Sequence, residues 1–279
     1  MPDAAGAAIE VAVGDVRFRV APEPDARYGA FWPLLSSGEF EPATVAVLTS
    51  RLGPGTTFVD VGAWIGPFTL LAAALGARVV AYEPDPMAFA LLVRHVALNP
   101  TLSSRIELHQ RAVSARGGTL VLDGGVHGLG NGRSRLSGRA TAGLAAATVA
   151  TVATISATAL ATVAAHAECT VLKIDIEGGE FAVVPRLARY LGEHRPTLLL
   201  SLHGRDPMEV LAGRLGWLRL VGLRLRDAPR RARVLRAIRS YPALQRSGAR
   251  RAVEWSTLSR WDRLALVVRA GETELLAGD

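Results

Sequence analysis

Short apolar runs bounded by turn residues recur along the chain. Four of them are apolar over most of their length: residues 57–61, 78–82, 170–175 and 196–203. Such runs are typical of strands buried on both faces of a sheet. Longer segments with helical periodicity lie between them: residues 69–75, 87–98 and 156–165. This order of strands and helices predicts an α/β fold with a mostly parallel central sheet flanked by helices.

Alternating apolar and polar residues indicate further strands. Ile9–Val13 and Val16–Val20 flank Gly14-Asp15, which predicts a hairpin. We also expect a helix over residues 43–51, and strands over the following segments: residues 105–110, 117–122, 148–155 and 261–269. We therefore predict an amino-terminal hairpin and helix cap over residues 1–50, and one α/β domain over residues 51–279. Residues 205–260 would form an Arg-rich helical insertion before the closing strand.

The strand at 57–61 ends in a turn marked by Gly62 and Gly66 and is followed by a helix. Gly62 lets the backbone approach a ligand, and the helix amino terminus offers unpaired N–H groups. Glu83 ends the next strand, about 20 residues further on, where nucleotide-binding folds place a carboxylate for both ribose hydroxyls. Trp64 stands where the dinucleotide fingerprint needs glycine. This argues against a bound pyrophosphate and favours a nucleoside without phosphate, such as S-adenosylmethionine.

A second chemically rich run is Leu172-Lys173-Ile174-Asp175-Ile176-Glu177-Gly178-Gly179-Glu180-Phe181. It contains the only lysine of the chain and three acids at the carboxyl end of the predicted strand. Ligands of open α/β sheets bind at this end, so Asp175 and Glu177 are expected to face the ligand. Glu180 is expected to begin the next helix, where a carboxylate favours the helix dipole. His203 ends the following strand on the same rim.

This run resembles the FkbM methyltransferases, as do residues 58–66, 82–86 and 97–99. The resemblance extends over residues 36–204. It implies a Rossmann-like class I methyltransferase fold, S-adenosylmethionine as cofactor and methyl transfer to a hydroxyl oxygen. The chain departs from the family pattern at three positions: Trp64 and His95 replace asparagines, and Ser156 replaces an aspartate.

Pattern and resemblance together predict the site. The expected cofactor-binding residues are Asp60, Gly62, Ala63, Trp64, Gly66, Glu83, Pro84, Arg111, Ala112 and Asp175. The expected catalytic residues are Lys173, Asp175, Glu177 and His203. Any of the last three could be the base that takes the hydroxyl proton. Asp175 and Glu177 could instead hold Mg²⁺, since hard oxygen ligands suit that ion.

Four other features of the sequence need interpretation. Residues 124–138 are rich in glycine and suit a substrate lid or a surface loop equally. Glu39 and Glu41 precede the first core strand and are interpreted as solvated residues at a helix start rather than as ligand contacts. His95 is expected to pack or hydrogen-bond locally. Residues 140–167 carry no formal charge, but their Ala and Thr content argues against a transmembrane helix.

Composition limits the class of protein. The 279 residues include one cysteine, Cys169, which excludes an internal disulfide and fits a reducing compartment. The amino terminus lacks the pattern of a signal peptide, and we expect a cytoplasmic protein. The formal net charge is +7, carried almost wholly by arginine. Such a bias reflects genome composition as readily as a basic binding surface.

The favoured acceptor is a hydroxyl of a small molecule or glycan. An RNA methyltransferase that uses the Arg-rich segment and a non-catalytic nucleoside-binding module are the alternatives. Nucleic acid is disfavoured as a substrate because the run at Asp175 lacks the Asn/Asp-Pro-Pro-aromatic motif of amino-methylating DNA enzymes. Cys169 lies at the wrong end of its strand to act as the nucleophile of a cytosine-C5 enzyme. The pattern gives no oligomeric state.

Overall fold

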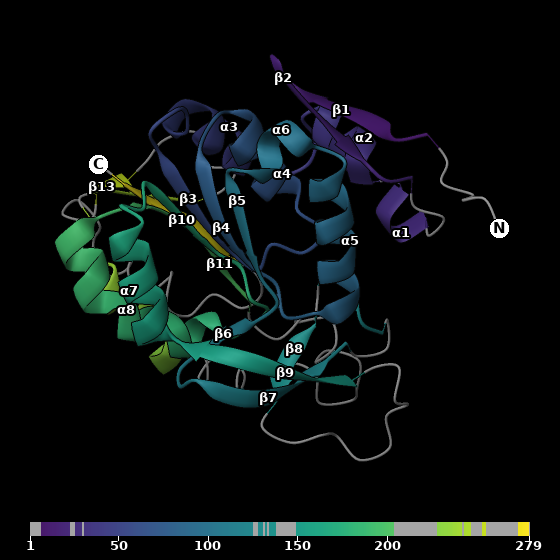
Figure 1. Cartoon of the computed structure of the whole chain (residues 1–279). Coiled ribbons are helices and arrows are strands. Elements are labelled where there is room, and N and C mark those ends of the chain that lie inside the picture. The colour runs from purple at the N-terminus through teal and green to yellow at the C-terminus, as the bar shows by residue number, and fades with distance from the viewer. Residues whose placement is uncertain are drawn as a thin grey trace, which may run out of the picture.

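A computed structural model describes most of the chain (Figure 1). The described residues are 7–22, 26–29, 31–124, 128–130, 132, 134–137, 149–203, 228–241, 243–246, 253–254 and 273–278. The strand expected over residues 261–269 and most of the Arg-rich segment 205–260 lie outside them.

The main sheet has the strand order β13-β12-β14-β11-β10-β3-β4-β5. Its parallel part consists of β3 (Thr57–Val61), β4 (Arg78–Tyr82), β5 (Ile106–His109), β10 (Val171–Ile174) and β11 (Thr197–Leu202). The antiparallel part consists of β12 (Ala243–Arg246), β13 (Val253–Glu254) and β14 (Thr273–Gly278). The mostly parallel α/β fold is therefore confirmed. The strand order reverses beside β3, because β4 pairs on one side of it and β10 on the other.

Helices cover both faces of this sheet (Figure 1). One layer contains α3 (Pro42–Arg51), α4 (Pro67–Ala74), α5 (Pro86–Ala97) and α6 (Pro100–Ser103). The other contains α7 (Ala157–His166) and α8 (Glu180–His194). Successive strand residues point to opposite faces. Phe58 accordingly packs in a core with α4 and α5, and Val59 packs in a core with α7 and α8.

The amino-terminal segment forms the predicted hairpin, β1 (Ile9–Val13) and β2 (Val16–Val20), followed by α1 (Ala26–Gly29) and α2 (Phe31–Ser36). The Asn99 amide ties this hairpin to the end of α5: its Oδ1 accepts from Arg19 N at 2.8 Å, and its Nδ2 donates to Arg19 O at 2.7 Å. His95 is buried in α5. Its Nδ1 lies 2.9 Å from Ile65 O, and its ring packs edge-to-face against Trp32. The local packing role expected for His95 is confirmed.

A second sheet lies below the carboxyl ends of the main strands in Figure 1. Its strands, in the order β6-β9-β7-β8, are β6 (Ala112–Ser114), β7 (Gly118–Asp123), β8 (Arg135–Ser137) and β9 (Val149–Ser156). The strands expected over residues 117–122 and 148–155 are β7 and β9. Ser156 caps α7, with its hydroxyl accepting from Ala159 N at 3.1 Å. Within the described part of the chain, no helix is long and apolar enough to cross a membrane.

Candidate active site

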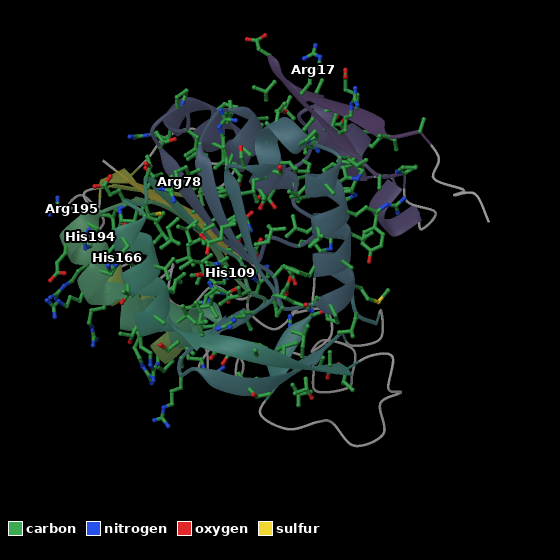
Figure 2. All side chains as sticks on the ribbon, viewed as in Figure 1. Arg17, Arg78, His109, His166, His194 and Arg195 are labelled. Atoms are coloured by element: carbon green, nitrogen blue, oxygen red, sulfur yellow. The ribbon has the colours of Figure 1, made fainter. Side chains whose placement is uncertain are left out.

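A cavity of about 370 Å³ lies at the carboxyl ends of β3, β4, β10 and β11. Leu122 of β7 and Leu136 of β8 close it from the second sheet. Most of the residues expected at the site line it: Gly62, Ala63, Trp64, Glu83, Pro84, Arg111, Ala112, Lys173, Asp175, Glu177 and His203. Asp60 and Gly66 are not among the lining residues. His109, labelled in Figure 2, marks the same rim at the end of β5 and stacks on Tyr82, which lines the cavity.

Gly62 lies where β3 and β10 meet. Its φ of 87° is in the left-handed region, and a Cβ at this position would lie 1.8 Å from the carbonyl oxygen of Asp175. Asp175 N in turn donates to Val61 O at 2.9 Å. The two loops that carry the site are therefore in direct contact at the point where the strand order reverses, and only glycine permits that contact.

Asp60 and Lys173 form a buried pair below the cavity floor. Lys173 Nζ lies 3.6 Å from Asp60 Oδ1 and 3.4 Å from Asp175 Oδ2, and it donates to Gly62 O at 3.1 Å. Thr69 donates to Asp60 Oδ2 at 2.8 Å. Burial alone would lower the pKa of Lys173, but Asp175, Asp60 and Glu41 together raise it above its ordinary value. Lys173 is therefore a permanent cation that holds the strand ends together.

Glu83 stands at the end of β4 with its carboxylate buried. Its Oε2 accepts from Trp64 N at 2.7 Å and its Oε1 from Asp85 N at 2.8 Å. Each oxygen has capacity for a further hydrogen bond. Burial raises the pKa of Glu83 to about 8, and the two N–H groups oppose that shift only in part. The carboxyl is thus fixed in orientation, has no cation beside it among the described residues, and lines the cavity.

The glycine-rich segment over residues 124–138 is hydrogen-bonded to residues beside the cavity. Gly130 O accepts from Tyr28 Oη at 2.8 Å and from Trp64 Nε1 at 2.9 Å. Asp85 Oδ2 accepts from Gly130 N and from the Ser134 hydroxyl. The described part of the segment is therefore docked on Trp64, after β3, and on Asp85, after β4, and Ser134 lines the cavity. Residues 125–127, 131 and 133 lie outside the described part.

The β10 and β11 ends bring three acids around one histidine. His203 Nε2 lies 3.5 Å from Asp175 Oδ1 and 3.6 Å from Glu177 Oε1, and Nδ1 lies 3.1 Å from Glu180 Oε1. Glu180 begins α8, as expected, and accepts from the N–H groups of Ile176 and Gly178, each at 2.9 Å. Burial by itself would lower the pKa of His203, but the hydrogen bond and charge of Glu180, with the other two acids, raise it to about 9. His203 is therefore an imidazolium at neutral pH.

The family model described as "Methyltransferase FkbM domain" matches residues 60–215, more than half of the chain. The chain belongs to the FkbM methyltransferase family. A search of the curated proteins finds no match.

Three solved structures show how far the FkbM fold of this chain resembles known ones. The FkbM methyltransferase from Methylobacillus flagellatus has 17% identity and a TM-score of 0.39, over 81% of this chain and 44% of that one. A SAM-dependent methyltransferase from Agrobacterium tumefaciens has 9% identity and a TM-score of 0.45, over 99% and 70%. Geranyl diphosphate C-methyltransferase from Streptomyces coelicolor has 12% identity and a TM-score of 0.41, over 92% and 85%. The chain thus spans less than half the length of the first of them.

The acids of this FkbM site do not fit a divalent ion. Asp175, Glu180 and His203 have ligand atoms within 4.8 Å of one another. However, the imidazole of His203 lies between Asp175, Glu177 and Glu180, 3.1 to 3.6 Å from an oxygen of each, in the place that an ion shared by the carboxylates would take. Glu177, the second ligand suggested by the sequence, is not in this group; its Oε2 lies 3.9 Å from Arg135 Nη2. We therefore derive no step through Mg²⁺.

Several cavity residues of this FkbM chain were not found by sequence reasoning. Phe40 and Glu41 line the cavity although we interpreted Glu41 as solvated; Phe68, Ser134 and Leu136 line it as well. A backbone signal accompanies three cavity residues. Glu41, Trp64 and Glu177 have φ of 40°, 51° and 53°, a left-handed conformation that is rare for residues other than glycine and is concentrated at functional sites. That signal exists only once the backbone is known.

Proposed function

We propose that the protein transfers a methyl group from S-adenosylmethionine to a hydroxyl oxygen of a small molecule or glycan. The observation that carries the proposal is that one cavity is lined both by Glu83, whose buried carboxyl is held by two backbone N–H groups, and by Glu177, whose pKa is raised to about 7 by burial. The cavity volume of about 370 Å³ lies within the range of small-molecule sites.

The residues of the first half of the site suit the cofactor. Glu83 would accept both ribose hydroxyls, because each of its oxygens keeps a free lone pair beside the N–H group it already binds. The turn of Gly62, Ala63 and Trp64 would contact the methionine part of the cofactor at the carboxyl end of β3. Pro84, Arg111 and Ala112 would flank the adenine. S-adenosylmethionine supplies an electrophilic methyl group on sulfur.

The residues of the second half suit the acceptor. Transfer forms a carbon–oxygen bond, and the hydroxyl proton must leave to a base. Burial raises the pKa of Glu177 to about 7, against the opposing charge of His203, so its carboxylate is a proton acceptor matched to neutral pH. His203 is already protonated, so it would stabilise the neighbouring carboxylates by its positive charge rather than accept the hydroxyl proton. Asp175 is the alternative base, since it also lines the cavity.

Labelled methyl transfer would test this proposal. The protein is incubated with methyl-labelled S-adenosylmethionine and three acceptor pools: hydroxylated small molecules, oligosaccharides and total RNA. We expect label in one of the first two pools, and at least about a 100-fold slower transfer by Glu177→Gln. Glu107→Gln, an exposed change on β5, is the control and should transfer at the wild-type rate. Label only in RNA would overturn the proposed acceptor, and cofactor binding without transfer to any pool would favour a binding module.

A further inference from the structure

A second hollow, which we call the basic groove, lies between α8 and the helix over residues 228–237. Its volume is about 530 Å³. Arg189 lines it from α8, and Arg233, Arg236 and Arg239 line it from the other side. The groove shares no lining residue with the methyl-transfer cavity. A ligand of the groove would therefore bind apart from the proposed reaction.

The charge of the groove is concentrated rather than spread. Arg233, Arg236 and Arg239 recur every third residue. The first two therefore share one face of the helix over residues 228–237, and Arg239 lies in the turn after that helix. All three are exposed. Over α8 and residues 228–241 the acids are Glu180, which is buried at the start of α8, and Glu193, which pairs with Arg189 at 2.8 Å. A genome-wide arginine bias does not by itself produce such a one-sided cluster.

The floor of the groove also favours a ligand. It is made of small residues, among them Gly192 and Ser240. The Ser240 hydroxyl is buried and has no hydrogen-bond partner among the described residues. The small residues leave the hollow open between the arginine side chains.

The residues that line the groove indicate which kind of anion it would bind. It has no aromatic side chain among its described lining residues, so it offers no platform for base stacking. Large exposed apolar side chains that could enter a membrane occur on other elements of the described chain, at Ile9, Leu34, Met87 and Val93. Guanidinium groups bind phosphate oxygens in pairs of hydrogen bonds. We propose that the basic groove binds a ligand with several adjacent phosphate groups, held through the phosphates alone.

The proposal is tested by direct binding to the full chain. Sodium tripolyphosphate represents a small polyphosphate, and a 12-base-pair RNA duplex represents a phosphodiester backbone; phosphatidylserine vesicles are the third probe. Each is titrated at about 50 to 200 mM salt. The groove variant is Arg233→Glu/Arg236→Glu. The matched control is Arg17→Glu/Arg19→Glu, which makes the same charge change on exposed residues of β2. In Figure 2, Arg17 lies at the top of the molecule, and Arg195, which follows α8, lies at its left edge.

We expect salt-sensitive binding of tripolyphosphate or the duplex that is weakened at least about 30-fold in the groove variant and changed less than about 3-fold in the control. Each phosphate contact adds about 0.9 to the slope of log affinity against log salt for a duplex, so the variant should lose about 2 from that slope. Binding of tripolyphosphate assigns a small ligand, and binding of the duplex alone assigns a nucleic-acid backbone. Equal losses in both variants, binding to vesicles alone, or no binding to any probe would overturn the proposal.

Discussion

Two buried carboxyls, Glu83 after β4 and Glu180 at the start of α8, make similar hydrogen bonds to the backbone. Each accepts two backbone N–H groups at distances between 2.7 and 2.9 Å. Within the described part of the chain, Glu83 has no cation beside it and it lines the cavity, whereas Glu180 lies against protonated His203 and does not line it. Glu180 is therefore satisfied by the protein itself. Glu83 is only partly satisfied, which is what a ligand-binding carboxyl requires.

The comparison teaches that hydrogen-bond number alone does not identify a binding carboxyl. Both side chains would appear equally well satisfied if only backbone donors were counted. Their neighbours distinguish them: desolvation raises the pKa of Glu83 to about 8, while His203 supplies a positive charge at Glu180. The predictions below test this difference, beginning with the contact that joins the two regions.

Gly62→Ala should have the largest effect. The added Cβ would meet the Asp175 carbonyl at 1.8 Å and would also require a left-handed backbone at alanine. Because the loops after β3 and β10 would have to separate, we expect the free energy of unfolding to fall by more than about 4 kcal/mol. Chemical denaturation measures it. Gly14→Ala is the control: its φ is 56° but nothing lies within 4 Å of the added Cβ, so only the conformational cost of about 1 kcal/mol should appear.

Glu180→Gln should destabilise the protein more than Glu83→Gln. An amide at position 180 would present an NH₂ group to a backbone N–H and would leave the imidazolium of His203 without its nearest carboxylate. We expect a loss of about 3 kcal/mol at neutral pH. Glu83→Gln turns the same NH₂ group toward a backbone N–H, but no cation among the described residues loses its partner there, so we expect a smaller loss of about 1 kcal/mol. Equal losses would mean that the two carboxyls do not differ as described.

The buried His95 should make stability depend on pH away from the site. Burial lowers its pKa to about 4, whereas a histidine of the unfolded chain titrates near 6.5. Between these values the unfolded state binds more protons, so stability falls as the pH is lowered through this window. We expect a loss of about 2 kcal/mol between pH 7 and pH 5 from this residue. His95→Asn should remove this part of the pH dependence of stability. The control His166→Asn, a change at an exposed position, should retain it. Chemical denaturation of both variants and the wild type at pH 7 and pH 5 measures the difference.

The first half of the site could be predicted from sequence because its signals are local. Gly62, Trp64 and Glu83 belong to one strand–turn–helix–strand unit whose spacing determines where each residue lies. The hairpin and β10 could be predicted for the same reason. Asp60 shows the limit of this reasoning. Its position at the end of β3 predicts a cofactor contact; its side chain pairs with Lys173 and Thr69, and Asp60 is not among the residues that line the cavity.

The rest of the site depends on tertiary contacts that no short pattern encodes. Leu122 and Leu136 reach the cavity because the second sheet folds below the main strands, and that sheet pairs β6 with a strand about forty residues away in sequence. Glu41 reaches the cavity because Phe40 packs on Phe31 and Phe68, with ring centroids 4.4 and 6.0 Å apart. The positive charge of His203 depends on three acids that surround it only in the fold.

The most direct measurement of the central claim is the thermal midpoint with and without S-adenosylhomocysteine, in the wild type, Glu83→Ala and the exposed control Glu107→Ala. At about 100 times its dissociation constant, the ligand should stabilise the wild type by about 2.7 kcal/mol, a rise of several degrees. The account predicts that this rise persists in Glu107→Ala and disappears in Glu83→Ala. An equal rise in Glu83→Ala, or no rise in folded wild type, would contradict the claim that Glu83 is the partly satisfied carboxyl that holds the cofactor.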